Sequence, residues 1–141
     1  MPAVGCEEVA GLLAPLMDGL VPDPESPPYV TSQEIGCSWV TPDVTIEDVR
    51  SLAVTIVLSE EEVPDPAEAA SFGMDVYVSD PRLEPYGGVA LWMPAGEGQF
   101  VGGGVGGVIV PGLQITVASA GFGKGTGFSL EHVLGLALGI L

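Results

Sequence analysis

Apolar residues near the N-terminus recur with the spacing of one helical face. Pro15 interrupts this pattern and would kink or shorten a helix, because proline cannot donate a backbone hydrogen bond. The pattern predicts a helix over about residues 5–17. The prolines that follow at 22–28 predict an extended, solvated connector. The apolar positions of the predicted helix are Val9, Leu12, Leu13, Leu16, Met17 and Leu20.

From Glu34 the hydrophobic period changes to two, which is typical of a strand with one buried face. Ile35, Cys37 and Trp39 fall on the side that should be buried. After a loop at 41–48, residues 52–58 are rich in β-branched side chains and nearly all apolar. This composition predicts a central strand buried on both faces. We expect the two strands to pair as a hairpin.

The second half of the chain predicts further strands between two helices. A short helix should start at Asp65-Pro66 and run to Phe72, since proline is tolerated in the first turn. Strands are expected at 88–93, 99–103, 107–110 and 113–118, with Pro111-Gly112 as a tight turn. Apolar residues from Leu130 onward form a closing helix that covers them, capped by Ser129 with His132 at the third helical position.

These elements predict a single α+β domain over residues 1–141, with an antiparallel sheet packed by N-terminal and C-terminal helices. Residues 98–123 carry no charge, and hydropathy alone would suggest a membrane span. The central Pro111-Gly112 and the glycines before it argue against a lipid-exposed helix. We therefore expect no transmembrane segment.

The chain is strongly acidic, with 19 Asp and Glu against 3 Lys and Arg and a formal net charge of −16. Such a chain repels phosphate backbones, so nucleic acid is excluded as a partner that a basic surface would bind. Glu60, Glu61, Glu62, Asp65 and Glu68 form the densest acidic stretch. Their oxygens could bind calcium, but no calcium-loop motif is present, and a solvated acidic loop is the preferred interpretation.

Cys6 and Cys37 are the only cysteines. Their separation does not match a C-x-x-C redox motif or half of a zinc site, and His132, as the single histidine, cannot complete a zinc site without carboxylates. A structural disulfide and two free thiols remain as alternatives. Residues 1–5 show neither a basic nor an apolar signal region, which indicates either a mature fragment lacking its signal peptide or a cytoplasmic protein.

Known catalytic and cofactor motifs do not fit their structural contexts here. Residues 102–107 match G-x-G-x-x-G but lead into a predicted strand and turn, whereas a dinucleotide site needs a helix there. Residues 123–126 resemble a phosphate loop but lack its earlier glycine and the hydroxyl residue directly after the lysine. Ser129 and His132 are better explained as a helix cap than as a catalytic dyad. We expect no catalytic residue, no cofactor and no metal site, and hence no enzyme.

Five aromatic residues could build a recognition surface, because aromatic side chains anchor many interfaces. They are Trp39, Phe72, Tyr77, Tyr86 and Trp92. Trp39 is expected in the core. Trp92 and Tyr86 are the candidate interaction surface, although Trp92 also suits a core position.

The order of features resembles a family of small actinobacterial secreted lipoproteins of unknown function. The resemblance rests on a cysteine opening the first helix, a Pro-rich loop, Cys37-Ser38-Trp39 on a strand, an alanine-rich helix, residues 88–92, a glycine-rich hairpin and a closing Leu/Ala helix. It implies an extracytoplasmic α+β domain with a Cys6–Cys37 bridge, anchored or released outside the membrane. This chain lacks the lipobox of that family, and no catalytic residue is carried over.

We therefore expect a non-catalytic cell-envelope domain that binds a protein, a cell-wall component or a small ligand. The alternative is a cytoplasmic acidic inhibitor or immunity-type protein that blocks a basic site on its partner. A carrier with a pocket between the sheet and the closing helix is a third hypothesis. The glycine-rich hairpin also allows a homodimer through an apolar edge.

Overall fold

The computed structural model describes residues 2–14, 16–42, 49–94, 104–122 and 128–141. Three α-helices, eight strands and one 3₁₀ turn lie within these ranges. In chain order they are α1 (Cys6–Leu13), β1 (Val21–Pro22), β2 (Tyr29–Val30), β3 (Glu34–Val40), β4 (Val49–Ser59), α2 (Pro66–Ser71), β5 (Tyr77–Val78), η1 (Glu84–Tyr86), β6 (Val89–Pro94), β7 (Gly104–Val110), β8 (Gly112–Phe122) and α3 (Leu130–Ile140).

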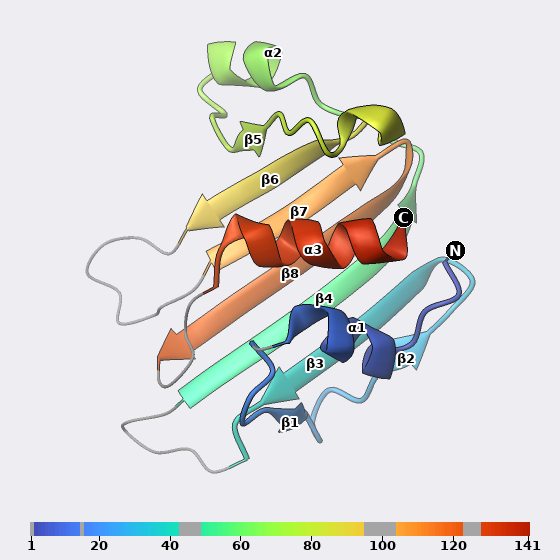
Figure 1. Ribbon diagram of the computed structural model, residues 1–141, viewed down its shortest axis with the longest axis vertical. Helices are drawn as coiled ribbons and strands as arrows, with labels where there is room; N and C mark the ends of the chain where they lie inside the picture. The colour runs from blue at the N-terminus through green and yellow to red at the C-terminus, as the bar shows by residue number, and fades with distance from the viewer. Residues whose placement is uncertain (1, 15, 43–48, 95–103, 123–127) are drawn as a thin grey trace.

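All eight strands belong to one antiparallel sheet in the order β1-β3-β4-β8-β7-β6-β5, with β2 also paired to β3 (Figure 1). The expected hairpin of residues 34–40 and 52–58 is confirmed by the antiparallel pairing of β3 with β4, in which Cys37 lies opposite Val54. The turn at Pro111-Gly112 is also confirmed. Gly112 takes a φ of 86°, which suits the position after proline in a type II turn.

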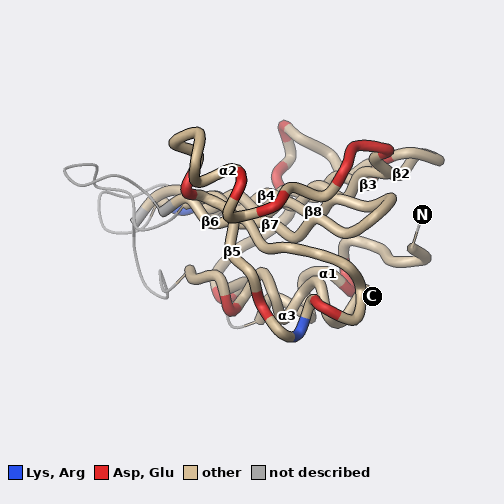
Figure 2. Tube along the Cα trace, turned by 90° about the horizontal axis from the view of Figure 1, so that it is seen from above, with Lys and Arg blue, Asp and Glu red and all other residues tan. Residues whose placement is uncertain are grey.

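The two terminal helices pack side by side on one face of the sheet, as Figure 2 shows with the sheet edge-on. Alternate residues of β3, β4, β8 and β7 point towards them and form the core with both helices. Fully buried members include Ile35, Ile56, Ile115, Val133 and Leu134. The predicted α+β architecture, with an antiparallel sheet packed by N-terminal and C-terminal helices, is confirmed.

Two glycines allow this close packing. A Cβ placed on Gly106 of β7 would lie 2.7 Å from Cγ2 of Val133 and 3.2 Å from the ring of Trp92. A Cβ on Gly139 of α3 would lie 2.6 Å from Cδ2 of Leu12. The missing side chains let α3 approach both the sheet and α1, because packed interiors leave no space for an additional carbon.

Cys6 and Cys37 form a disulfide with their Cα atoms 5.7 Å apart. The bond joins the first residue of α1 to the middle of β3, and Cys37 is only 3% exposed. Of the two alternatives left by the sequence, the structure therefore has the disulfide. It fixes α1 onto the helix-covered face of the sheet, next to Trp39, which is in the core as expected.

Several predicted boundaries were wrong for identifiable reasons. The first helix ends at Leu13, well before residue 17, because a residue preceding proline disfavours helical torsions and Ala14 adopts ψ of 140°. The Pro-rich connector is exposed along most of its length, as predicted, but it is not wholly irregular. It begins as β1, where Pro22 pairs with Trp39 at the sheet edge, a position that tolerates proline.

The largest correction concerns the central strand. Residues 52–58 were expected to be buried on both faces, but burial along β4 alternates, with Ala53, Thr55 and Val57 only half-buried. The reason is that α1 and α3 cover a single face. Strands 107–110 and 113–118 are confirmed but longer, as β7 and β8, whereas the strand predicted at 99–103 lies outside the described residues.

Candidate functional site

A groove of about 390 Å³ lies between α2 and β5, at the end of the sheet order where β5 pairs with β6. We call it the α2–β5 groove. It is lined by Glu62, Val63, Pro64, Asp65, Glu68, Ala69, Phe72, Met74 and Tyr77. The lining therefore combines three carboxylates with apolar and aromatic side chains and contains no basic residue.

Local sequence explains why the groove forms. Asp65 caps α2 by accepting hydrogen bonds from the backbone N–H groups of Ala67 at 2.9 Å and Glu68 at 3.4 Å. The helix ends at Ser71, and Gly73 adopts a φ of 83° that turns the chain back towards β5. The N–H of Met74 then donates to the carbonyl of Ala69 at 3.0 Å. This turn places Phe72 and Met74 on either side of one glycine.

Phe72 and Met74 are unusually exposed for apolar side chains, at 78% and 52%. Phenylalanine is usually buried, so an exposed one beside a groove is informative. Figure 2 shows acidic residues on and next to α2. An apolar anchor surrounded by carboxylates is complementary to a partner segment that carries both an apolar side chain and positive charge.

The sequence marked Phe72 as one of five aromatic candidates but singled out other residues. Trp92 is half-buried and its ring lies 5.3 Å from that of Phe128, between centroids. Tyr86 is 41% exposed and lies in η1, before β6 begins, whereas Trp92 lies towards the end of β6. An interaction surface at Trp92 and Tyr86 stays a prediction.

The acidic stretch does not bring metal ligands together. Within the described ranges, no group of three or more His, Cys, Asp or Glu side chains is placed to hold a metal ion. Glu62, Asp65 and Glu68 instead contribute to the groove walls.

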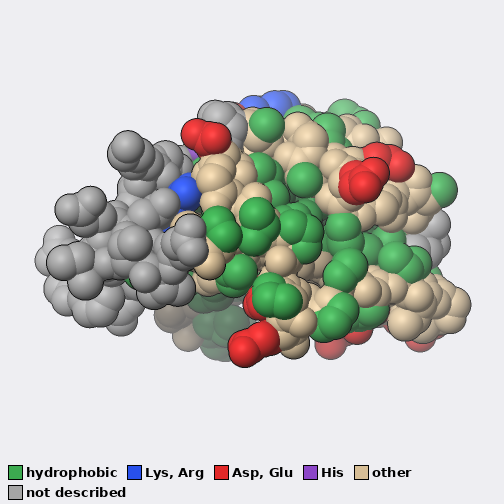
Figure 3. Space-filling model, turned by 90° about the horizontal axis from the view of Figure 1, so that it is seen from below, with side chains coloured by type: hydrophobic (Ala, Val, Ile, Leu, Met, Phe, Trp, Pro, Cys, Tyr) green, Lys and Arg blue, Asp and Glu red, His purple; other side chains and the backbone are tan. Residues whose placement is uncertain are grey.

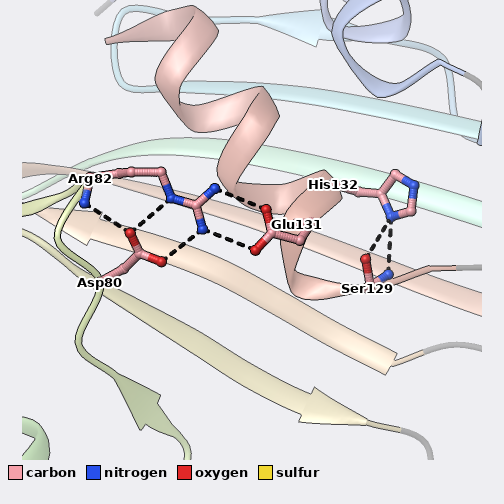
Figure 4. A network of polar contacts seen from close by, with 5 residues as sticks. All are labelled: Asp80, Arg82, Ser129, Glu131 and His132. Carbon is pink, nitrogen blue, oxygen red and sulfur yellow. Dashed lines mark hydrogen bonds and ion pairs between the residues drawn. The ribbon is translucent and has the colours of Figure 1, made fainter.

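Arg82 links two distant segments through a network of charged hydrogen bonds (Figure 4). Its Nε and Nη2 donate to Asp80 at 2.9 and 2.8 Å, and its Nη1 and Nη2 donate to Glu131 at 2.9 Å each. Such fork-shaped pairing suits the planar guanidinium. The network holds the segment after β5 against the first turn of α3, and hydrogen bonds from Arg82 lower the pKa of Asp80 to about 2.

Replacing Arg82 with glutamine should return the pKa of Asp80 from about 2 towards its ordinary 3.8, because the donor side chain that holds the carboxylate is lost. A depressed native pKa stabilises the fold above pH 3.8, and this stabilisation is lost as the pH falls through about 2. R82Q should therefore be less stable than the parent protein at neutral pH and equally stable below pH 2. An NMR titration of the Asp80 carboxyl carbon measures the shift, and an unchanged midpoint in R82Q would contradict it.

Ser129 and His132 form a helix cap (Figure 4). The backbone N–H of Ser129 donates to Nδ1 of His132 at 3.1 Å, and the Ser129 hydroxyl lies 3.1 Å from the same nitrogen. The predicted capping role is thus confirmed. The nitrogen that a serine nucleophile would need as its base already accepts the backbone N–H.

Other cavities give weaker indications. A cavity of about 20 Å³ lies between the sheet and the helices near Leu16, Leu52 and Phe128, which is space for about one water molecule and not for a carried ligand. A hollow of about 250 Å³ beside the disulfide includes Pro22 and Trp39 in its lining. Figure 3 views this β1 end of the molecule, where hydrophobic side chains are gathered between a few carboxylates.

No helix in the described part of the chain is both long and apolar enough to cross a membrane. Comparisons of the chain with protein-family models, with curated proteins and with solved structures gave no match.

Proposed function

We propose that this protein is a non-catalytic domain that works outside the cytoplasm and binds a basic protein segment through the α2–β5 groove. The observation that carries this proposal is the exposed Phe72 beside a groove walled by carboxylates and free of basic residues. The predicted protein partner thus becomes a basic segment, and the acidic charge of the chain serves to attract it.

The disulfide supports an oxidising compartment. Cystine bonds persist in secreted and envelope proteins, whereas the cytoplasm keeps most thiols reduced. Because Cys37 is buried in the core, the bond is part of the packed structure. The resemblance to small secreted lipoproteins has the same implication.

The groove chemistry supports the partner class. Burying a phenylalanine side chain contributes about 1.5–3 kcal/mol, so Phe72 can act as an anchor that carboxylates alone would not provide. A net charge of −16 accelerates encounter with a basic partner, while the apolar contact determines where that partner binds.

Replacing Phe72 with alanine should weaken binding of a basic, leucine-containing peptide by about 10- to 100-fold, measured by fluorescence anisotropy with a labelled synthetic peptide. The reason is that F72A removes the anchor and leaves every charge in place. The fold should be nearly unaffected, within about 0.5 kcal/mol, because Phe72 is largely exposed.

Two controls separate the groove from general attraction to an acidic protein. Val30→Ala removes an exposed apolar side chain on β2, far from β5 in the sheet order, and should leave peptide binding unchanged. A peptide with glutamate in place of arginine should not bind. Equal binding by F72A and the parent protein would show that charge alone attracts the peptide and would overturn the proposal.

The cytoplasmic inhibitor remains as the alternative, because it too would use an acidic groove against a basic site. The two differ in thiol state. Protein expressed in an oxidising compartment and purified without reductant should show no free thiol when titrated in denaturant. Two reactive thiols in that titration would count against the extracytoplasmic proposal and favour the inhibitor.

A further inference from the structure

The face of the sheet turned away from α1 and α3 has a graded pattern of side-chain sizes. We call this side of β3, β4, β8, β7 and β6 the open face; strand pairing and side-chain alternation define its members. Its β3, β4 and β8 positions are mostly small: Gly36, Ser38, Ser51, Ala53, Thr55, Thr116, Ala118 and Ala120. Its β7 and β6 positions are mostly larger: Val105, Ile109, Val89, Leu91 and Met93.

The open face is almost uncharged although the chain as a whole carries −16. Along these five strands, the described open-face positions include a single ionisable group, Glu34, at the beginning of β3. Partial burial raises the pKa of the adjacent Tyr29, and a hydrogen bond to Glu34 raises it further. The ring of Tyr29 lies over Gly36 and occupies the space that a Cβ there would need. The strands of this face therefore add almost no charge repulsion between two copies.

The open face is large enough for a specific interface. Five strands about 4.8 Å apart and about seven residues long, at about 3.3 Å per residue, give a flat area of about 550 Å². Two such faces would bury about 1,100 Å² in total. A biological interface is expected to bury at least about 1,000 Å². In Figure 1, α2 lies beyond these strands, at the β5 edge, and in Figure 2 it rises from that edge on the side of the sheet opposite α1 and α3.

We propose that the open face is the interface of a homodimer in which two sheets pack face to face, between outer layers formed by α1 and α3. A twofold axis parallel to the strands and centred on β8 places β6 and β7 of one copy opposite β3 and β4 of the other. In the register of the sheet, Met93 of one copy then faces Ser38 of the other, and Val105 faces Ala53. Large side chains thus meet small ones on both sides of the axis, which is the self-complementarity that a symmetric interface requires.

Sedimentation equilibrium of the full chain should show a dimer that dissociates in the micromolar range, as suits an interface at the lower end of the usual size. Added salt should strengthen the dimer, since it screens repulsion between two acidic copies. Added salt should instead weaken binding of the basic peptide in the α2–β5 groove, because it screens the attraction between opposite charges. The two sites are therefore tested independently. A monomer at all concentrations and at high salt would overturn the dimer.

Matched glutamate substitutions locate the interface. Ala53→Glu buries a charge in the proposed contact and should raise the dimer dissociation constant on the order of 100-fold. Ala70→Glu adds the same charge to exposed helix α2 and should leave the constant unchanged. Equal effects of the two variants would mean that charge alone, and not the open face, controls association.

A crosslink tests the geometry without relying on the folding of A53E. The proposed axis places Thr116 of one copy opposite Thr116 of the other, so T116C should be joined rapidly by a short bismaleimide. The native cystine cannot react with this reagent. A70C, on the exposed surface of α2, should crosslink slowly. If T116C crosslinked no faster than A70C, the face-to-face arrangement would be wrong.

Discussion

Replacing both cysteines with alanine is expected to lower the free energy of unfolding by about 3–4 kcal/mol. The disulfide closes a loop between residues separated by 31 positions, and its loss restores conformational freedom to the unfolded chain. That change is a large part of the stability of a single small domain, which is typically about 5–15 kcal/mol. Urea unfolding of C6A/C37A beside the oxidised parent protein measures it.

Reductant supplies the control for this prediction. It should destabilise the parent protein by a similar amount and leave C6A/C37A unchanged, because only the parent has a bond to reduce. Alanine at Cys37 also leaves a small space in the core, so the mutant should be slightly less stable than the reduced parent. If reductant opened the bond without moving the unfolding midpoint, the disulfide would not stabilise the fold.

Replacing Gly106 with alanine is expected to lower the free energy of unfolding by about 1–3 kcal/mol, because the added carbon collides with Val133 of α3. The ring of Trp92 closes the other side of the position at 3.2 Å, so the new methyl group cannot turn away. Urea unfolding and the near-ultraviolet circular dichroism of Trp92 should both report the change.

The same substitution at Gly135 provides a control of opposite sign. Gly135 lies in α3 with open space around its Cβ position. Since alanine favours helix over glycine, G135A should raise the free energy of unfolding by about 0.5–1 kcal/mol. Neutrality of G106A would show that α3 does not pack on β7 as closely as described, and destabilisation by G135A would show that the space around Gly135 is not open.

Local pattern predicted the elements that local energetics control. The capping residues Asp65 and Ser129 marked the starts of α2 and α3, because a side-chain oxygen or a following polar residue satisfies backbone groups within one turn. Pro111-Gly112 marked its turn through the torsions these two residues prefer. Alternation at Ile35, Cys37 and Trp39 identified the inward side of β3.

The candidate site was only partly predictable. Phe72 was recognised as an aromatic candidate and the acidic stretch as a solvated loop, yet their shared groove depends on how the turn at Gly73 directs the chain to β5. A predicted amphipathic pattern assigns residues to faces but does not show which face remains uncovered. The same limit explains why residues 52–58 were assigned two buried faces.

The sequence by itself determined the periodicities, caps and turns of this protein, and its charge, because these depend on neighbouring residues. For the two cysteines it left two possible states, a disulfide or free thiols. Only the tertiary structure decided the bond between Cys6 and Cys37, the packing of α3 at Gly106 and the exposure of Phe72. It also left the open face uncovered by α1 and α3. These features depend on contacts between segments far apart in the chain. Such contacts exist only once the chain has folded and α1 and α3 have both covered the same face of the sheet.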